Sequence, residues 1–218
     1  MTRRTRMPAM ALAGPMAALL LAGCGGGDSG SKNSDKIAGA DPGVTPSASP
    51  SASVSGSPGR PNIELPSDAT DKYENWRTGD EAKDAVLADT ARRIDATNDA
   101  ILRGDISAPA LSFYYRDKAL TGAVAWVKAY VDADLSFTGT TRYYAPEVTL
   151  SGPTTASVAY CSDESKGFNK NRKTNKVDKR PSSESPYVLS NTRLERNRQG
   201  VWQTSNLVSK RGEKACAA

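Results

Sequence analysis

One of the three cysteines, Cys24, directly follows the small residues of Leu21-Ala22-Gly23. This is the pattern of a lipobox, where small side chains fit the signal peptidase and the free thiol accepts a diacylglyceryl group. Arginines at 3, 4 and 6 and an uncharged run from Pro8 to Leu21 precede it, as in a secretory signal peptide. The sequence therefore predicts that residues 1–23 are removed and that Cys24 becomes a lipidated N-terminus bearing fatty acyl chains such as palmitate. An ordinary secretory signal with a chance cysteine is the alternative.

The other two cysteines, Cys161 and Cys216, remain as a pair after lipidation. An even number of cysteines outside the cytoplasm favours a disulfide. Closing a loop of about 55 residues would contribute roughly 4 kcal/mol in the chain-entropy model. Two unpaired buried thiols are the alternative. Neither position resembles a metal site, and the sequence predicts no metal and no cofactor.

The chain contains no histidine. This excludes Ser-His-Asp and Cys-His catalysis as well as the commonest zinc ligand sets. Acid–base chemistry would instead need a buried carboxylate assisted by tyrosine hydroxyls. The available residues have no diagnostic spacing, so no catalytic site is predicted. They are Asp117, Asp132 and Asp134 as carboxylates, and Tyr114, Tyr143 and Tyr144 as hydroxyl donors.

A long polar loop, expected from Glu164 to Pro186, carries a cluster of positive charge with Asp178 as its lone acid between 166 and 180. Such a cluster could bind an anionic wall polymer or phospholipid head groups through screened electrostatics. A solvated hairpin tip without a partner is the simpler interpretation. The cations are Lys166, Lys170, Arg172, Lys173, Lys176, Lys179 and Arg180.

Charge and composition also bound the partners and the domain organisation. The formal charge is +5, and three of these charges leave with the signal peptide. The mild remainder gives no reason to expect a nucleic-acid partner. Residues 24–66 are rich in Gly, Ser and Pro, so we expect a disordered tether between the lipid anchor and a single domain over 67–218.

A long helix is expected over 78–103, with Thr78 as N-cap, Glu81 completing a capping box and Gly104 as C-cap. Residues at helical spacing define its buried face, and two arginines are assigned to the opposite face. The buried face comprises Leu87, Ala91, Ile94, Asn98, Ile101 and Leu102, and the opposite face Arg92 and Arg93.

A second helical stretch is expected over 109–134, broken near Asp117, with core positions at Leu111, Tyr114, Tyr115, Ala123, Trp126, Val127, Tyr130 and Val131. The period then changes to two, which indicates strands. The expected strands are 136–144, 154–163, 187–196 and 201–208, with a turn at 197–200. Helices followed by an antiparallel meander indicate an α+β domain.

This order of elements resembles the NTF2-like cone fold. More narrowly, the chain resembles secreted lipoproteins of high-GC Gram-positive bacteria (actinobacteria). In these, one strand ends in Cys-x-Asp-x-Ser, here 161–165, a Val-Trp pair lies in the last hairpin, here Val201-Trp202, and a cysteine closes the chain, here Cys216. The resemblance covers about Thr78 to Cys216. It implies N-terminal helices packed on a curved antiparallel sheet and a place in the cell envelope, more than an activity.

The sequence thus leaves two classes of function open. The first is a non-catalytic binding or interaction module, held by lipid on the outer face of the cytoplasmic membrane, with a wall polymer or an envelope protein as partner. The alternative is a pocket for a small apolar ligand between helices and sheet. An isomerase or dehydratase working without histidine is the less favoured form of that alternative.

Overall fold

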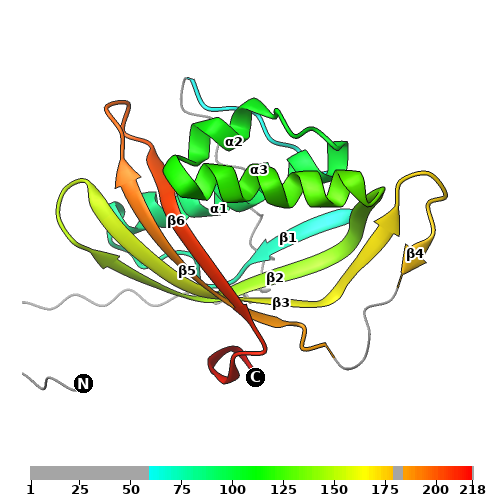
Figure 1. The fold of residues 1–218 in the computed structure, drawn as a ribbon. Coiled ribbons are helices and arrows are strands. Elements are labelled where there is room, and N and C mark those ends of the chain that lie inside the picture. Colours follow the sequence, from blue (N-terminus) through cyan, green and yellow to red (C-terminus); the bar gives the residue numbers. More distant parts are fainter. Residues whose placement is uncertain (1–58, 179–183, 218) are drawn as a thin grey trace, which may run out of the picture. The chain divides into compact units, whose positions relative to one another are not determined.

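A computed structural model describes residues 59–178 and 184–217. The expected signal peptide, Cys24, most of the expected tether, and Lys179 and Arg180 of the basic cluster lie outside the described residues. The elements, drawn in Figure 1, are β1 (Ala69–Tyr73), α1 (Glu81–Arg103), α2 (Pro109–Tyr114), α3 (Asp117–Asp132), β2 (Leu135–Leu150), β3 (Thr155–Asn171), β4 (Val177–Asp178), β5 (Tyr187–Arg196), β6 (Trp202–Arg211) and a short 3-10 turn, Lys214–Cys216.

The strands form one sheet in the order β1-β2-β3-β5-β6, with β4 paired to β3. The sheet curves, and the three helices lie across its concave face (Figure 1). Register shifts in β2, between Thr140 and Arg142 and between Tyr144 and Glu147, mark irregularities of the kind that bend a strand. The predicted α+β architecture, with helices packed on a curved and mainly antiparallel sheet, is confirmed. One addition is β1, which pairs with β2 in parallel and was not predicted.

The ends of α1 confirm one predicted cap and correct the other. Gly104 ends the helix in the left-handed conformation at φ 72°, as expected. The N-cap is Asp80 and not Thr78, because the Asp80 carboxylate accepts hydrogen bonds from the Ala82 and Lys83 N–H groups at 2.9 and 3.1 Å. The Thr78 hydroxyl instead donates to Asp84 at 2.8 Å. The sequence offers two capping residues in close succession, and the later one is used.

The core packs α1 against the sheet and against α2 and α3. Leu87, Ile94 and Ile101 are buried as predicted. The prediction for Arg93 is wrong: it is 4 % exposed and lies inside the domain. Arg93 lies on the buried face of α1 together with Val86 and Ala100, which are spaced seven residues apart from it on either side. This buried face is wide because α1 packs against the sheet and against α2 and α3. The prediction for Trp126 is also wrong, because its side chain is 55 % exposed.

The second helical stretch breaks where Tyr115 adopts an extended conformation, between α2 and α3. The Arg116 N–H donates to the Thr204 carbonyl at 3.0 Å, so the break is held by β6. The break near Asp117 is therefore confirmed. The polar loop predicted over 164–186 is corrected in part, because β3 continues to Asn171 and β4 pairs with it.

Contacts at Cys216 and at residues 59–66, the last and first parts of the described chain, tie these segments to the domain. The predicted disulfide is present between Cys161 in β3 and Cys216 in the C-terminal turn. At the other end, residues 59–66, assigned to the tether from composition, lie against the domain. Ile63 packs on the cluster around Tyr114, and Arg60 forms an ion pair with the buried Asp89.

Candidate functional site

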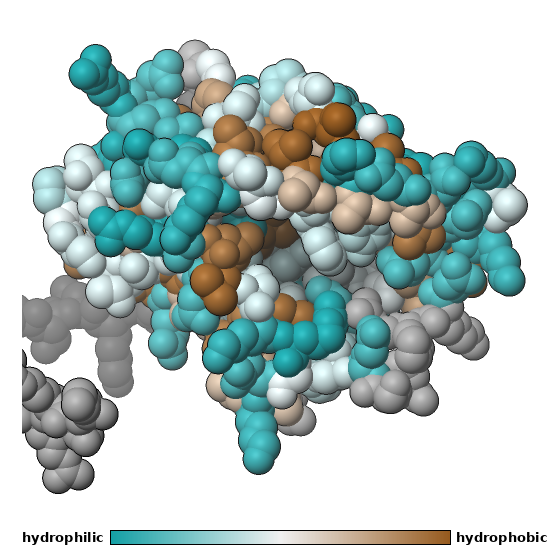
Figure 2. All heavy atoms as spheres, viewed as in Figure 1, coloured by the Kyte–Doolittle hydropathy of each residue, from teal (hydrophilic) through white to brown (hydrophobic). Residues whose placement is uncertain are grey.

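A cleft of about 570 Å³ lies between α1 and α3 on one side and the concave face of the sheet on the other. Figure 2 shows this side of the molecule hollowed between the helices and the strands. The cleft exists because both walls carry small side chains. On α3 these are Ala119, Gly122 and Ala123, and on the sheet they are Ser162, Ser190 and Ser209.

The small residues keep the two walls apart without filling the space between them. A Cβ placed on Gly122 would meet no atom within 4 Å, so this position borders open space. The Ser190 and Ser209 hydroxyls lie 2.9 Å apart on neighbouring strands and form one hydrogen bond. The α3 wall is therefore mainly apolar, with Lys118 at one end, while the sheet wall carries hydroxyl groups beside the apolar Val188 and Leu207.

The floor of the cleft holds the Arg93 guanidinium, which reaches it from α1. Its Nη2 donates to the Tyr160 hydroxyl at 2.7 Å and its Nη1 to the Tyr115 hydroxyl at 3.3 Å. The guanidinium carbon lies 5.5 Å from the Tyr115 ring centre and 5.8 Å from that of Tyr160. Cation–π attraction from both rings therefore helps to hold this charge in place.

The charge on Arg93 lacks a carboxylate partner within the described part of the chain. Its hydrogen-bond partners are the two tyrosines, and its Nε is buried without a hydrogen-bond acceptor there. Its charge also influences the Asp95 carboxyl, two residues further along α1. Arginine does not lose its proton in proteins, so the group stays cationic. Burying an unpaired charge is costly, and such charges are ordinarily paired. The open cleft beside Arg93 is the space from which a partner could come.

A pair of acids, Asp71 on β1 and Asp95 on α1, adjoins the cleft. Asn98 donates to Asp71 at 2.7 Å, and the Tyr73 hydroxyl donates to Asp95 at 2.6 Å. Burial, and then the neighbouring charge of Asp95, raise the pKa of Asp71 to about 7. Burial also raises the pKa of Asp95. The folded protein therefore keeps a proton on this pair to a higher pH than two ordinary carboxyls would.

The acid pair reaches the cleft through Asn98, which also donates to the Tyr143 hydroxyl at 3.3 Å. Both Asn98 and Tyr143 line the cleft. Burial raises the pKa of Tyr143 well above its ordinary value, so its hydroxyl stays protonated at neutral pH. The wall next to the acid pair is thus polar and uncharged.

The carboxylates singled out from the sequence do not meet in the cleft. Asp117, Asp132 and Asp134 lie at the surface in ion pairs with Arg116, Lys128 and Lys173. Of the three tyrosines, only Tyr143 lines the cleft. Tyr114 is buried beside Val201, and Tyr144 donates to the Cys216 carbonyl. The structure therefore does not assemble the candidate acid–base residues into a site.

The basic cluster is partly used within the domain. Lys170 pairs with Asp68 at 2.6 Å and Lys173 with Asp134 at 2.5 Å. Arg172 donates to the Ile101 and Leu102 carbonyls at the end of α1, where a positive charge complements the helix dipole. Lys166 and Lys176 are exposed, and no ion pair joins them to another described residue.

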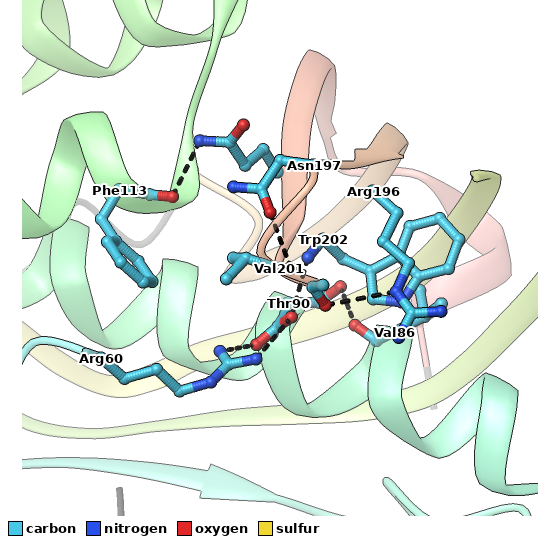
Figure 3. A network of polar contacts seen from close by, with 11 residues as sticks. Arg60, Val86, Thr90, Phe113, Arg196, Asn197, Val201 and Trp202 are labelled. Carbon is cyan, nitrogen blue, oxygen red and sulfur yellow. Dashed lines mark hydrogen bonds and ion pairs between the residues drawn. The ribbon is translucent and has the colours of Figure 1, made fainter. Parts of the chain in front are cut away.

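A second buried charge, Asp89, has a complete set of partners. It is 2 % exposed and accepts the Trp202 N–H at 2.8 Å while pairing with Arg60. Figure 3 shows the Arg60 side chain and the Trp202 backbone converging on the same point of α1, next to Thr90. Asp89 was not singled out from the sequence, and Arg93 was assigned to the exposed face of the helix. Their position on the apolar stripe of α1 is the signal that could have found them.

Residues 59–178 and 184–217 are the part of the chain that the structure describes. In that part of the chain, no group of three or more Cys, Asp or Glu side chains is placed to hold a metal ion. No helix there has the length and apolar character to span a bilayer.

No family model and no curated protein matches the chain. Solved structures show likenesses. A ketosteroid isomerase-like protein from Erwinia carotovora atroseptica SCRI1043 is 20 % identical, with a TM-score of 0.39 over 59 % of this chain and 96 % of that one. The intermembrane space region of the chloroplast protein ARC6 is 12 % identical, with a TM-score of 0.40 over 62 % and 99 %. A protein from Catenulispora acidiphila is 8 % identical, with a TM-score of 0.42 over 63 % and 99 %. At these values we take nothing about ligand or activity from them.

Proposed function

We propose that this protein is a lipid-anchored lipoprotein of the actinobacterial type, whose domain binds a small organic ligand in the cleft without transforming it. The observation that carries the binding function is the open cleft of about 570 Å³. Arg93 lies at its floor as a buried positive charge without an ion-pair partner among the described residues. Cavities of a few hundred Å³ with a few convergent polar groups are the usual form of a small-molecule site. This favours the pocket over the basic loop as the principal binding feature.

The non-catalytic part of the proposal rests on the acids available in the cleft. Glu164 is the carboxylate among the described lining residues, and it is engaged at 2.7 Å by Arg211. The acid pair of Asp71 and Asp95 adjoins the cleft but is separated from it by Asn98 and Tyr143. A general base must reach the proton that it abstracts, and these positions do not offer one beside Arg93.

The anchoring part rests on Cys24 and its signal pattern. Two or more acyl chains hold a protein stably at a membrane, at roughly 0.8 kcal/mol per buried methylene. We expect the mature protein on the outer face of the cytoplasmic membrane, recovered in the detergent phase and absent from the culture medium. The Cys24→Ala variant should be released or remain unprocessed, and mass spectrometry should locate the acyl chains on Cys24. An unmodified mature N-terminus at another residue would contradict this part.

The cleft is tested by filling it. The Gly122→Leu variant directs a side chain into open space on α3, while Ala125→Leu places the same side chain on the exposed face of that helix. Pyrenebutyrate, a fluorescent acid with a large aromatic body, serves as the probe. We expect the wild type and Ala125→Leu to bind it alike and Gly122→Leu to bind it at least about tenfold more weakly. Equal binding by all three proteins would show that the cleft is not the site.

An anionic wall polymer or an envelope protein is the second candidate partner, and no nucleic acid is proposed. It is favoured by the exposed side chains of Lys166 and Lys176, which have no ion-pair partner among the described residues. Retention of the protein on immobilised teichoic acid should fall with added salt. It should also fall in a Lys166→Gln/Lys176→Gln variant. Retention that is the same with added salt and in the double variant would remove this candidate.

A further inference from the structure

We propose that the ligand of the cleft is an amphipathic organic monoanion whose carboxylate binds Arg93 and whose apolar body lies along α3 toward Trp126. This inference rests on the proposed binding function and adds the chemical class of the ligand. Three features of the cleft carry it: the unused donors of Arg93, its buried charge without an ion-pair partner in the described cleft, and the division of the walls into mainly apolar and hydroxyl-bearing sides.

The first feature is the hydrogen-bonding capacity of Arg93. A guanidinium has five N–H donors in a planar fork, and the described contacts of Arg93 are those to the Tyr115 and Tyr160 hydroxyls. Both tyrosine oxygens hold the fork in one orientation, and Tyr115 is itself fixed by the Thr97 hydroxyl at 2.8 Å. A carboxylate matches the geometry of this fork and can accept two of its N–H groups.

The second feature is the charge balance. Arg211 also borders the cleft but is paired with Glu164. Lys118, on the first turn of α3, is exposed at the rim. Arg93 therefore remains as a buried positive charge with no ion-pair partner in the described cleft, although its charge also acts on the nearby Asp95 carboxyl. One guanidinium can pair with one carboxylate, which favours a monoanion over a phosphate dianion.

The third feature is the shape of the walls. The apolar side is formed by Ala119 and Ala123 on α3 with Val188 of β5 facing the same cleft, and it leads to Trp126, which is 55 % exposed. Trp126 lies edge-on to Tyr130 with ring centres 5.3 Å apart. Apolar side chains gather along the helices that border the hollow in Figure 2. An alkyl or aromatic body along α3 would remove this exposed surface from water.

The test compares pyrenebutyrate with pyrenebutanol, which has the same apolar body but no charge. We expect the wild type to bind the acid at least about tenfold more tightly than the alcohol, because a hydrogen bond to a charged group contributes more than a neutral one. Arg93→Met should bind both probes with equal affinity. Arg103→Met, which removes an exposed arginine from the same helix, should keep the preference of the wild type.

The outcomes separate this inference from the proposed function. Equal affinity of the wild type for the two probes, with both lost in Gly122→Leu, would overturn the monoanion and leave the pocket intact. A preference that survives in Arg93→Met would also overturn it. If Arg93→Met does not fold, Tyr160→Phe provides the same test in milder form, since the guanidinium loses one of the acceptors that orient it and the preference should shrink. An unchanged preference in Tyr160→Phe would then count against the inference.

Discussion

Two buried charges on α1, Asp89 and Arg93, lie about one helical turn apart but differ in the partners that the protein provides for them. Asp89 receives Arg60 from the N-terminal segment and the N–H group of Trp202 from β6. Arg93 receives two neutral tyrosine hydroxyls and faces an open cleft. A charge whose partners all come from the protein contributes to holding the chain together. A charge that the protein leaves without an ion-pair partner among the described residues, beside open space, is the better indicator of a ligand.

The largest effect on stability is expected when the ion pair between Arg60 and Asp89 is broken. Arg60→Met leaves the Asp89 carboxylate buried without its cation, and this should lower the free energy of unfolding by about 3 kcal/mol. Urea denaturation of the full domain measures the change. Lys128→Met, which removes a cation from an exposed pair on α3, is the control and should change stability by less than about 1 kcal/mol. A loss no greater than that of the control would mean that the Arg60–Asp89 pair does not hold the segment.

The acid pair beside the cleft should give the next largest effect, and it depends on pH. The pKa of Asp71 rises from its ordinary 3.8 to about 7 in the folded state. Between these values the folded protein keeps a proton that the unfolded chain releases, so the free energy of unfolding falls as pH rises through this window. Asp71→Asn should flatten the slope between pH 4 and 7 in a series of urea titrations. A wild-type stability that rises across this window would contradict the assignment.

The stability of the protein should respond to loss of Arg93, which faces the open cleft, in the opposite sense to loss of Arg60. Arg93→Met replaces a buried, incompletely paired cation with an apolar side chain of similar length. We expect a change in the free energy of unfolding within about 1 kcal/mol, with stabilisation as the favoured direction. The same urea titration measures it. A loss as large as that of Arg60→Met would show that Arg93 is a structural charge and would erase the difference between the two sites.

The smallest effect is expected from filling the cleft. Gly122→Leu exchanges a helical glycine for a good helix former and should raise stability by up to about 1 kcal/mol, since the new side chain meets open space. Thermal unfolding with and without pyrenebutyrate measures both properties at once. Stability should rise slightly while the ligand-induced shift in melting temperature disappears. A marked fall in stability would mean that the cleft closes around Gly122.

The sequence predicted those parts of the fold that depend on local signals or on an even number of cysteines. Gly104 ends α1 because a glycine at that position accepts a left-handed conformation, and the turn at 197–200 places Gly200 at φ 82° for the same reason. Cys161 and Cys216 are the two cysteines that remain once Cys24 is assigned to the predicted lipid anchor. The antiparallel meander followed from alternation along each strand.

The candidate site escaped prediction because its residues are brought together over long separations. Arg93 meets Tyr160, which is 67 residues away, and Asp89 meets Trp202, which is 113 residues away. The sequence analysis assigned Arg92 and Arg93 to the outer face of the helix because they are charged. However, α1 packs against both the other helices and the sheet, and this buries Arg93. β1 was missed because its partner, β2, follows three helices later. Local patterns carry no information about such pairings.

The most direct test of the account is the ratio of the dissociation constants for pyrenebutanol and pyrenebutyrate, measured by fluorescence titration on the wild type and on Arg93→Met. We expect a ratio of about ten or more for the wild type and a ratio near one for the variant. A wild-type ratio near one, or the same high ratio in both proteins, would contradict the claim that Arg93 is held in the cleft for an anionic ligand.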